Sequence, residues 1–229
     1  KEMDLHTPTD IQARAIPQLL KLRSLVAVAE TGSGKTLAFV LPMLHHIKEL
    51  EAADCPIVDP GRPRGLIIVP TRELGEQVGR VLKSLTHETR VRVRLAIGGT
   101  AKQVARQNVN GNFEILVATP GRLADLASSD LAPRLNDASI LILDEADRML
   151  QLGFEEQLDA IDHLVHLHTN RQGKEPGRRR MRERGAGWGQ KQRLSSVLMR
   201  QSRGTHNTHT STARVRVLLS TLGVWNQMS

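Results

Sequence analysis

The stretch Ala29–Thr36, AETGSGKT, has the glycine spacing and the Lys-Thr ending of a loop that binds phosphate groups. It follows an apolar run and opens a helical pattern, which is the context that such a loop requires. Backbone N–H groups around its glycines can turn toward phosphate oxygens, Lys35 can reach the β- and γ-phosphates, and the Thr36 hydroxyl can ligate Mg²⁺. The predicted phosphate-loop contacts are Thr31, Gly32, Ser33, Gly34, Lys35 and Thr36. The usual pattern has glycine where Ala29 stands, and the alternative is a glycine-serine turn with a chance Lys-Thr.

A second group of candidate residues, Asp144, Glu145 and Asp147, ends an apolar run with the sequence LILDEAD. Carboxylates at the end of a buried strand can hold Mg²⁺ through water and can activate a water for attack on a phosphate. An acidic cluster after a strand is more often a helix start, so its pairing with Lys35 and Thr36 carries the interpretation. We predict Thr36 and Asp144 as Mg²⁺ ligands and Glu145 as the group that orients or deprotonates water.

The elements that must position these residues alternate along the first 170 positions. Strand-like apolar runs cover 24–29, 65–69, 93–97, 114–118 and 140–143, and helical patterns cover 35–50, 72–85, 101–108, 122–128 and 154–167. This alternation predicts an α/β fold in which helices flank a parallel sheet. Ligands of such sheets bind beyond the carboxyl ends of the strands, where both groups of residues are expected.

Composition restricts the classes of function. A single cysteine, Cys55, excludes a disulfide scaffold and favours a reducing, intracellular compartment. No apolar run reaches the ~18 residues of a membrane span, so we expect no membrane partner. Three Phe, two Trp and no Tyr argue against base-stacking platforms. Residues 171–229 carry 13 Lys and Arg against 2 Asp and Glu, whereas residues 1–170 carry 19 against 22, so the net charge of +8 comes wholly from the C-terminal part.

Further motifs follow in a fixed order: TPTDIQ (7–12), PTREL (70–74), GG (98–99), TPGR (119–122) and RMLQLGF (148–154). With DEAD at 144–147, the chain resembles the first RecA-like domain of a DEAD-box RNA helicase over about residues 5–167. The resemblance implies a RecA-like P-loop NTPase fold, ATP and Mg²⁺ as cofactors and RNA as a partner. It also implies that Gln12 binds the edge of the adenine, and it places Lys35, Asp144, Glu145 and Asp147 in the catalytic machinery.

The resemblance implies a set of residues that hold the RNA backbone without reading its sequence. Hydroxyls and backbone amides in the set offer hydrogen bonds to phosphates and sugars, and two arginines offer charge. The set is Pro70, Thr71, Arg72, Gly99, Thr119, Pro120, Gly121 and Arg122. The alternative is that Arg72 and Arg122 are helix-start residues held by local acidic partners such as Glu73 or Asp125.

The segment 214–223, RVRVLLSTLG, predicts a buried strand after a long stretch without apolar periodicity. In the resembled family a strand reading roughly LLFSAT follows the namesake motif, and its Ser and Thr couple ATP hydrolysis to strand separation through the last Asp. Here Ser220 comes 76 residues after Asp144, and no Ala separates it from Thr221. Because side chains alternate between the faces of a strand, we expect Ser220 to face Asp147 and Thr221 to be displaced.

The domain prediction is a RecA-like domain over 1–168, a basic low-complexity segment over 169–213 and a possible last strand within 214–229. The middle segment cannot bury enough surface to order itself, so we expect it to be disordered or foreign to the fold. It is either a genuine insertion that adds electrostatic affinity for RNA or sequence from a retained intron, a mis-joined exon or a faulty gene model. The charge asymmetry, the low complexity and the altered motif favour the second explanation.

The resemblance also implies a second RecA-like domain with arginine fingers, and we expect residues 1–229 to lack it. We therefore expect a monomer that binds nucleotide weakly and hydrolyses it negligibly by itself. The predicted function is that of an ATP-dependent RNA helicase core domain. The alternatives are a non-catalytic, truncated RNA-binding module, another P-loop ATPase such as a DNA helicase, and a chain that its basic segment prevents from folding.

Overall fold

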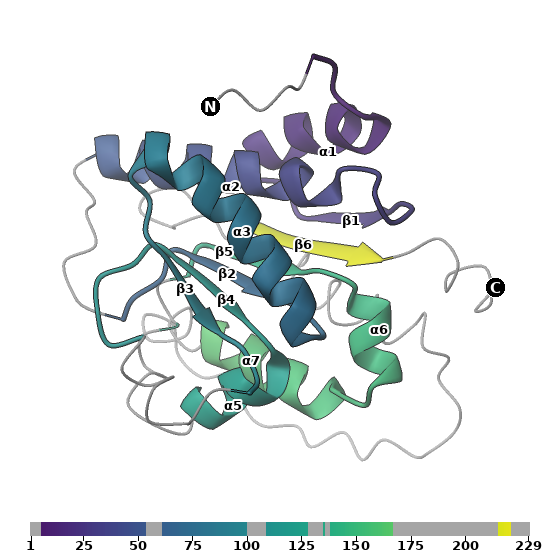
Figure 1. The fold of residues 1–229 in the computed structure, drawn as a ribbon, viewed down its shortest axis with the longest axis vertical. Helices are drawn as coiled ribbons and strands as arrows, with labels where there is room; N and C mark the ends of the chain where they lie inside the picture. The colour runs from purple at the N-terminus through teal and green to yellow at the C-terminus, as the bar shows by residue number, and fades with distance from the viewer. Residues whose placement is uncertain are drawn as a thin grey trace, which may run out of the picture.

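The computed structural model describes residues 6–53, 61–99, 109–127, 135, 138–166 and 215–220. Six strands form one sheet in the order β1-β6-β5-β2-β4-β3, and every neighbouring pair is parallel (Figure 1). The strands are β1 (Leu25–Val28), β2 (Gly65–Ile68), β3 (Val93–Ala96), β4 (Ile115–Ala118), β5 (Ile140–Leu143) and β6 (Val215–Ser220). The helices are α1 (Asp10–Leu20), α2 (Lys35–Ala52), α3 (Arg72–Thr89), α5 (Pro120–Ala127), α6 (Ala146–Gln151) and α7 (Glu155–His166).

Helices cover both faces of the sheet, because alternate residues of each buried strand point to opposite sides. On one face, Leu19 of α1, Phe39 of α2 and Val78 of α3 share a core with Ile67 of β2. On the other face, helices α5, α6 and α7 pack against the neighbouring strand residues, such as Leu66 of β2. The predicted α/β class with a flanked parallel sheet is confirmed.

Strand β6 lies in the interior of the sheet although it comes last in the chain. Val217 pairs with Leu25 of β1 on one side and with Ile142 of β5 on the other, and it is 2% exposed. The strand predicted at RVRVLLS is therefore present. The basic segment 169–213 and Thr221 lie outside the described residues.

The observed elements match the sequence patterns closely, with two additions. The five expected strands 24–29 to 140–143 are present with ends shifted by at most one residue, and the predicted helix 101–108 lies outside the described residues. Helices α1 and α6 were not predicted. Thr9 followed by Gln12 at the third position is a helix-start signal that could have revealed α1, whereas the six residues of α6 are too few to show a period.

Among the described residues, the helices are each too short or too polar to cross a bilayer.

Candidate functional site

The loop between β1 and α2 is shaped by two glycines in the left-handed backbone region. Gly32 has φ +80° and Gly34 has φ +89°, a region that L side chains rarely adopt. A Cβ at Gly34 would also come within 2.5 Å of the Gln12 amide nitrogen. The left-handed backbone therefore favours glycine at Gly34, and a side chain there would also displace the Gln12 amide, as expected for a phosphate-cradling loop.

Lys35 opens α2 and points its ammonium group back into this loop. Its Nζ donates hydrogen bonds to the carbonyl oxygens of Ala29 at 2.6 Å and Glu30 at 2.7 Å. The Ser33 hydroxyl donates to the same Glu30 oxygen at 2.7 Å. The loop thus holds the lysine among polar oxygens at the N-terminus of an 18-residue helix, where the helix dipole favours anions. Thr36 lies in the first turn of the same helix.

Gln12 connects α1 to the phosphate loop. Its Oε1 accepts from the backbone N–H of Thr9 at 3.1 Å, and its Nε2 donates to the Gly34 carbonyl at 3.2 Å. The side chain is buried, at 9% exposed. The family resemblance implies an adenine contact for Gln12, which stays a prediction, and the structure adds a hydrogen bond from Gln12 to the loop. That contact joins residues 22 positions apart, which no local pattern indicates.

Asp144 follows β5 and is almost fully buried, at 3% exposed. Within the described residues its Oδ1 is buried and has no hydrogen-bond partner, while its backbone N–H donates to the Ile68 carbonyl at 2.9 Å. Burial raises the pKa of Asp144 to about 6, and the charge of Glu145 adds to this, while Lys35 acts in the opposite direction. A buried carboxylate oxygen without a hydrogen-bond partner has the chemistry of a Mg²⁺ ligand.

The donor set fits Mg²⁺ held partly by substrate and water. No group of three or more His, Cys, Asp or Glu side chains with metal-binding spacing exists among the described residues. Mg²⁺ commonly uses one or two protein carboxylates together with substrate phosphates. Asp144, with the Thr36 hydroxyl on the loop side, is consistent with that arrangement.

Glu145 and Asp147 turn the chain from β5 into α6. Glu145 has φ +52° and ψ +48°, which is uncommon for a residue with a side chain, and it precedes the first helical residue. Its Oε2 accepts from Nη1 of Arg148 at 3.3 Å. Asp147 is 1% exposed in the first turn of α6. The left-handed backbone at Glu145 thus makes a tight turn, and both Glu145 and Asp147 belong to this turn.

Strand β6 separates the two strands that carry these groups. Val28, the last residue of β1, pairs with Ser220, and Leu143, the last residue of β5, pairs with Leu218. Because adjacent strands lie about 4.8 Å apart, the ends of β1 and β5 are roughly 10 Å apart, and the phosphate loop must span that distance. The backbone of Ser220 therefore ends between the phosphate loop and the acidic group. The Ser220 side chain, for which a contact with Asp147 is predicted, lies outside the described residues.

The residues predicted to hold RNA follow three adjacent strands. Pro70–Arg72 follow β2, Gly99 follows β3 and Thr119–Arg122 follow β4, and these strands are neighbours in the order β2-β4-β3. The guanidinium of Arg72 covers the backbone of Gly99, since a Cβ there would overlap Arg72 Nη1. Thr71 begins α3, and its Oγ1 accepts from the N–H of Leu74 at 3.3 Å. The structure therefore places this set at the carboxyl ends of three neighbouring strands, which we call the RNA edge.

The accessibility of the set is uneven. Pro70, Thr119 and Pro120 are buried. Arg72 donates through Nε to Glu76 at 2.8 Å rather than to Glu73, and its side chain is half exposed. Arg122 lies 3.9 Å from Asp125 with a side chain 11% exposed. Both arginines have local acidic partners, as the alternative interpretation expected, but Arg72 also packs over Gly99, and its exposed half can still reach an anion.

Comparison with known proteins identifies relatives of this chain among RNA helicases. Residues 9–177 match the sequence model of the DEAD/DEAH box helicase family. The chain is 43% identical over 160 residues to the pre-mRNA-processing ATP-dependent RNA helicase PRP5 of Chaetomium globosum, covering 69% of this chain and 15% of that protein. It is 40% identical over 174 residues to the ATP-dependent RNA helicase DBP2 of Encephalitozoon cuniculi, covering 75% of this chain and 33% of that protein. The chain thus spans a third or less of these relatives.

Solved structures agree with the sequence relatives. The yeast DEAD-box splicing factor Prp28 aligns with a TM-score of 0.69 and 27% identity, over 96% of this chain and 41% of that one. Prp28 from Chaetomium thermophilum bound to ADP aligns with a TM-score of 0.62 and 29% identity, over 93% and 39%. The fold is therefore RecA-like, as the sequence predicted. The chain belongs to the DEAD/DEAH box helicase family.

Proposed function

We propose that this chain is the nucleotide- and RNA-binding core of an ATP-dependent RNA helicase. It binds ATP with Mg²⁺ at the phosphate loop, holds the RNA backbone along the neighbouring strand ends, and couples hydrolysis to RNA unwinding or remodelling. The observation that carries the proposal is Asp144, a buried carboxylate with an unpartnered Oδ1 that lies within the electrostatic reach of Lys35. A purely structural aspartate would be expected to satisfy this oxygen.

Each residue of the nucleotide site has a distinct role. Lys35 exchanges its loop carbonyls for phosphate oxygens, and Thr36 and Asp144 hold Mg²⁺, which supplies charge neutralisation at the phosphates. Glu145 accepts a proton from water as the water oxygen bonds to the γ-phosphorus and the bond from that phosphorus to the β–γ bridging oxygen breaks, releasing ADP. Gln12 binds the adenine edge while it remains attached to the phosphate loop.

The remaining assignments concern coupling and assembly. Asp147, with Ser220 and Thr221 at the end of β6, couples the nucleotide state to RNA. The RecA-like unit extends over residues 1–168 and is completed by the strand within 214–229. A second RecA-like domain supplies arginine fingers, which can contribute about 10³–10⁵ in rate, so hydrolysis by this chain alone is slow.

The nucleotide site is tested by Mg²⁺-dependent binding of a fluorescent ADP to residues 1–229. Wild type is expected to bind, Lys35→Ala and Asp144→Asn are expected to lose most of the Mg²⁺-dependent affinity, and Lys48→Ala serves as the control. Lys48 lies on the same helix and pairs with Glu51. Folded variants with unchanged affinity would show that the phosphate-loop assignment is wrong.

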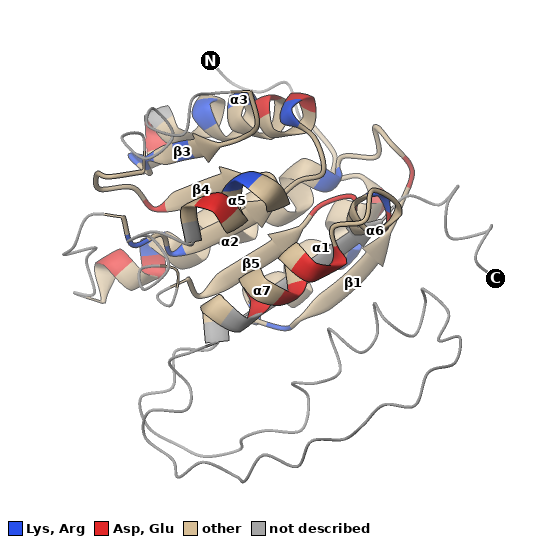
Figure 2. Cartoon of the chain, turned by 90° about the horizontal axis from the view of Figure 1, so that it is seen from below, with Lys and Arg blue, Asp and Glu red and all other residues tan. Residues whose placement is uncertain are grey.

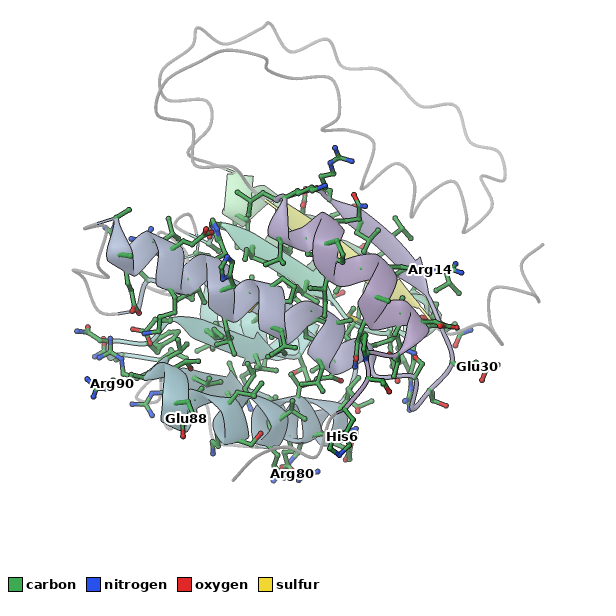
Figure 3. The ribbon with its side chains drawn as sticks, turned by 90° about the horizontal axis from the view of Figure 1, so that it is seen from above. His6, Arg14, Glu30, Arg80, Glu88 and Arg90 are labelled. Carbon is green, nitrogen blue, oxygen red and sulfur yellow. The ribbon has the colours of Figure 1, made fainter. Side chains whose placement is uncertain are left out.

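The RNA surface is tested with two arginines of one helix. Arg72 begins α3 at the proposed RNA edge, and Arg90 ends it on the far side, where Figure 3 shows its side chain pointing outward. Each charge is removed by substitution with Gln in a version that lacks 171–213. Arg72→Gln is expected to weaken binding of single-stranded RNA and to reduce its salt dependence, whereas Arg90→Gln changes neither. Equal losses in both variants would contradict the assigned edge.

A further inference from the structure

We infer that Arg148 is a positioning residue for Glu145: its guanidinium holds Oε2, which keeps Glu145 out of the Mg²⁺ shell that Asp144 enters and leaves Oε1 for the attacking water. The inference rests on the proposed nucleotide site. It assigns a role to a side chain that lies outside the phosphate loop and the acidic group themselves.

The contact itself is specific. Nη1 of Arg148 donates to Oε2 of Glu145 at 3.3 Å, and the Glu145 side chain is only 18% exposed while that of Arg148 is 54% exposed. Within the described residues this is the one hydrogen bond of the Glu145 carboxylate. A carboxylate held through one oxygen keeps the other available as an acceptor.

The backbone fixes both ends of this pair. Glu145 is held in the left-handed region, and its carbonyl accepts from the N–H of Met149 at 3.1 Å, which closes the first turn of α6. Residues three apart on a helix share a face, so Arg148 stands beside Glu145. Met149, adjacent to Arg148, is fully buried and anchors the turn. The guanidinium therefore approaches Glu145 from a helix turn whose backbone is fixed by the Met149 contact.

Without Arg148, the carboxylates of Asp144 and Glu145 could both bind the same cation. Asp144 has an unpartnered Oδ1 next in sequence to Glu145, and a divalent cation there would attract both side chains. Carboxylates bind such cations in the mono- or bidentate mode, so a released Glu145 can join Asp144 as a second ligand. Arg148 prevents this by holding Glu145 with a charge of its own.

The test is the affinity of Mn²⁺, used as a paramagnetic substitute for Mg²⁺, in the presence of ADP. It is measured from the electron paramagnetic resonance signal of unbound Mn²⁺, relative to a protein-free titration of Mn²⁺ with the same ADP, because ADP alone also binds Mn²⁺. Arg148→Ala is expected to bind Mn²⁺ more tightly than wild type, by on the order of tenfold, similar in size but opposite in sign to the loss that follows when a residue supporting metal ligands is removed. Disruption of the fold would weaken binding instead, so the direction of the change separates positioning from damage.

Two further variants isolate the route of the effect. In a Glu145→Gln background, Arg148→Ala is expected to give no gain, because the released side chain no longer carries a charge. Arg148→Lys is expected to stay close to wild type, since it keeps the cation. The matched control is Lys48→Ala, which removes an equally spaced surface pair, Lys48 to Glu51 at 2.6 Å, and should leave Mn²⁺ affinity unchanged.

The outcomes are distinguishable. If wild type binds Mn²⁺ with ADP and Arg148→Ala shows equal or weaker affinity, the inference is wrong and the proposed function stands. A gain of equal size with Glu145 and with Gln at that position also overturns it, because Arg148 would then act only through its charge on the whole site. If wild type binds no Mn²⁺ with ADP, the proposed function fails, and the role of Arg148 fails with it.

Discussion

At the scale of single residues, Asp144 shows how the fold raises the energy of a group that the proposed chemistry uses. Folding moves its carboxyl from water into a nearly closed site beside Glu145, and its pKa rises from 3.8 to about 6. Above pH 6 the folded chain must keep a charge that burial disfavours. The unfolded chain carries the same charge in water, so the nucleotide-free fold is less stable there than a neutral side chain would make it.

Asp144→Asn is therefore expected to raise the free energy of unfolding at pH 8, without nucleotide or Mg²⁺, by up to about 3 kcal/mol at 1.36 kcal/mol per pKa unit. The pKa of Asp144 is higher in the folded state, so its contribution to the free energy of unfolding is lost as pH rises from 3.8 through 6. The gain from Asn should accordingly shrink as pH falls across that interval. Urea unfolding at several pH values measures it, with the exposed Asp159→Asn as control. Destabilisation at pH 8 would contradict the expectation.

His46 imposes the opposite dependence on pH. It is 8% exposed on α2, and within the described part of the chain its two ring nitrogens have no hydrogen bond. Burial lowers its pKa from 6.5, Glu49 acts against this, and His45 and Arg64 act in the same direction as burial. As pH falls below 6.5 the unfolded chain gains a proton that the folded chain resists, so stability falls. We expect His46→Leu to lose this component and His45→Leu to retain it, as measured by urea unfolding between pH 5 and 8. Identical pH profiles for His46→Leu and wild type would disprove it.

At the scale of elements, β6 joins the phosphate-loop strand to the rest of the sheet. Val217 is buried between β1 and β5, whereas Val26 on the neighbouring edge strand β1 is 45% exposed. The same substitution at the two positions therefore separates a core strand from an edge. Val217→Ala is expected to lower the free energy of unfolding by about 2 kcal/mol and to weaken ADP binding. Val26→Ala is expected to change the free energy of unfolding by no more than about 0.5 kcal/mol. Equal costs by urea unfolding would mean that β6 is not required for the sheet.

At the scale of the whole molecule, residues 171–213 contribute a positive charge and lengthen the connection between α7 and β6, and each of these has its own measurable effect. Residues 171–213 carry eleven Lys and Arg against two Glu. Figure 2 shows acidic residues along α7, and Glu155 and Glu156 lie in its first turn. Their negative charge repels phosphate groups, so α7 is a poor site for RNA. Most of the salt dependence of RNA binding by the chain is then expected to come from 171–213, with a smaller part from Arg72 at the proposed RNA-binding strand ends.

Deleting 171–213 leaves five residues between His166, where α7 ends, and Val215, where β6 begins. Five residues lie within the usual range for a helix-to-strand connection. Loop-closure entropy for 48 residues against five predicts a gain of about 2 kcal/mol in unfolding free energy. We expect the shortened chain to bind fluorescent ADP as well as wild type while its RNA affinity becomes less dependent on salt. Loss of folding after the deletion would show that the segment belongs to the domain.

The sequence by itself determined the five early strands, the helices α2, α3, α5 and α7, the late strand β6 and the family, because these depend on local periodicity and on short motifs, whereas α1 and α6 were missed. The spacing of Gly32, Gly34 and Lys35 predicted the shape of the loop between β1 and α2, and the proposal that these residues bind phosphate rests on it. Even the late strand at Val215–Ser220 was visible as an apolar run after a long stretch without one.

Only the tertiary structure decided how these parts meet. It inserted β6 between β1 and β5, fastened Gln12 to Gly34 across 22 positions, paired Arg148 with the turned Glu145 and buried Asp144 enough to raise its pKa. Strand order and burial depend on contacts between residues far apart in the chain. A local pattern contains no information about which partner such a residue will find, and the energetics of the candidate site are set by those partners.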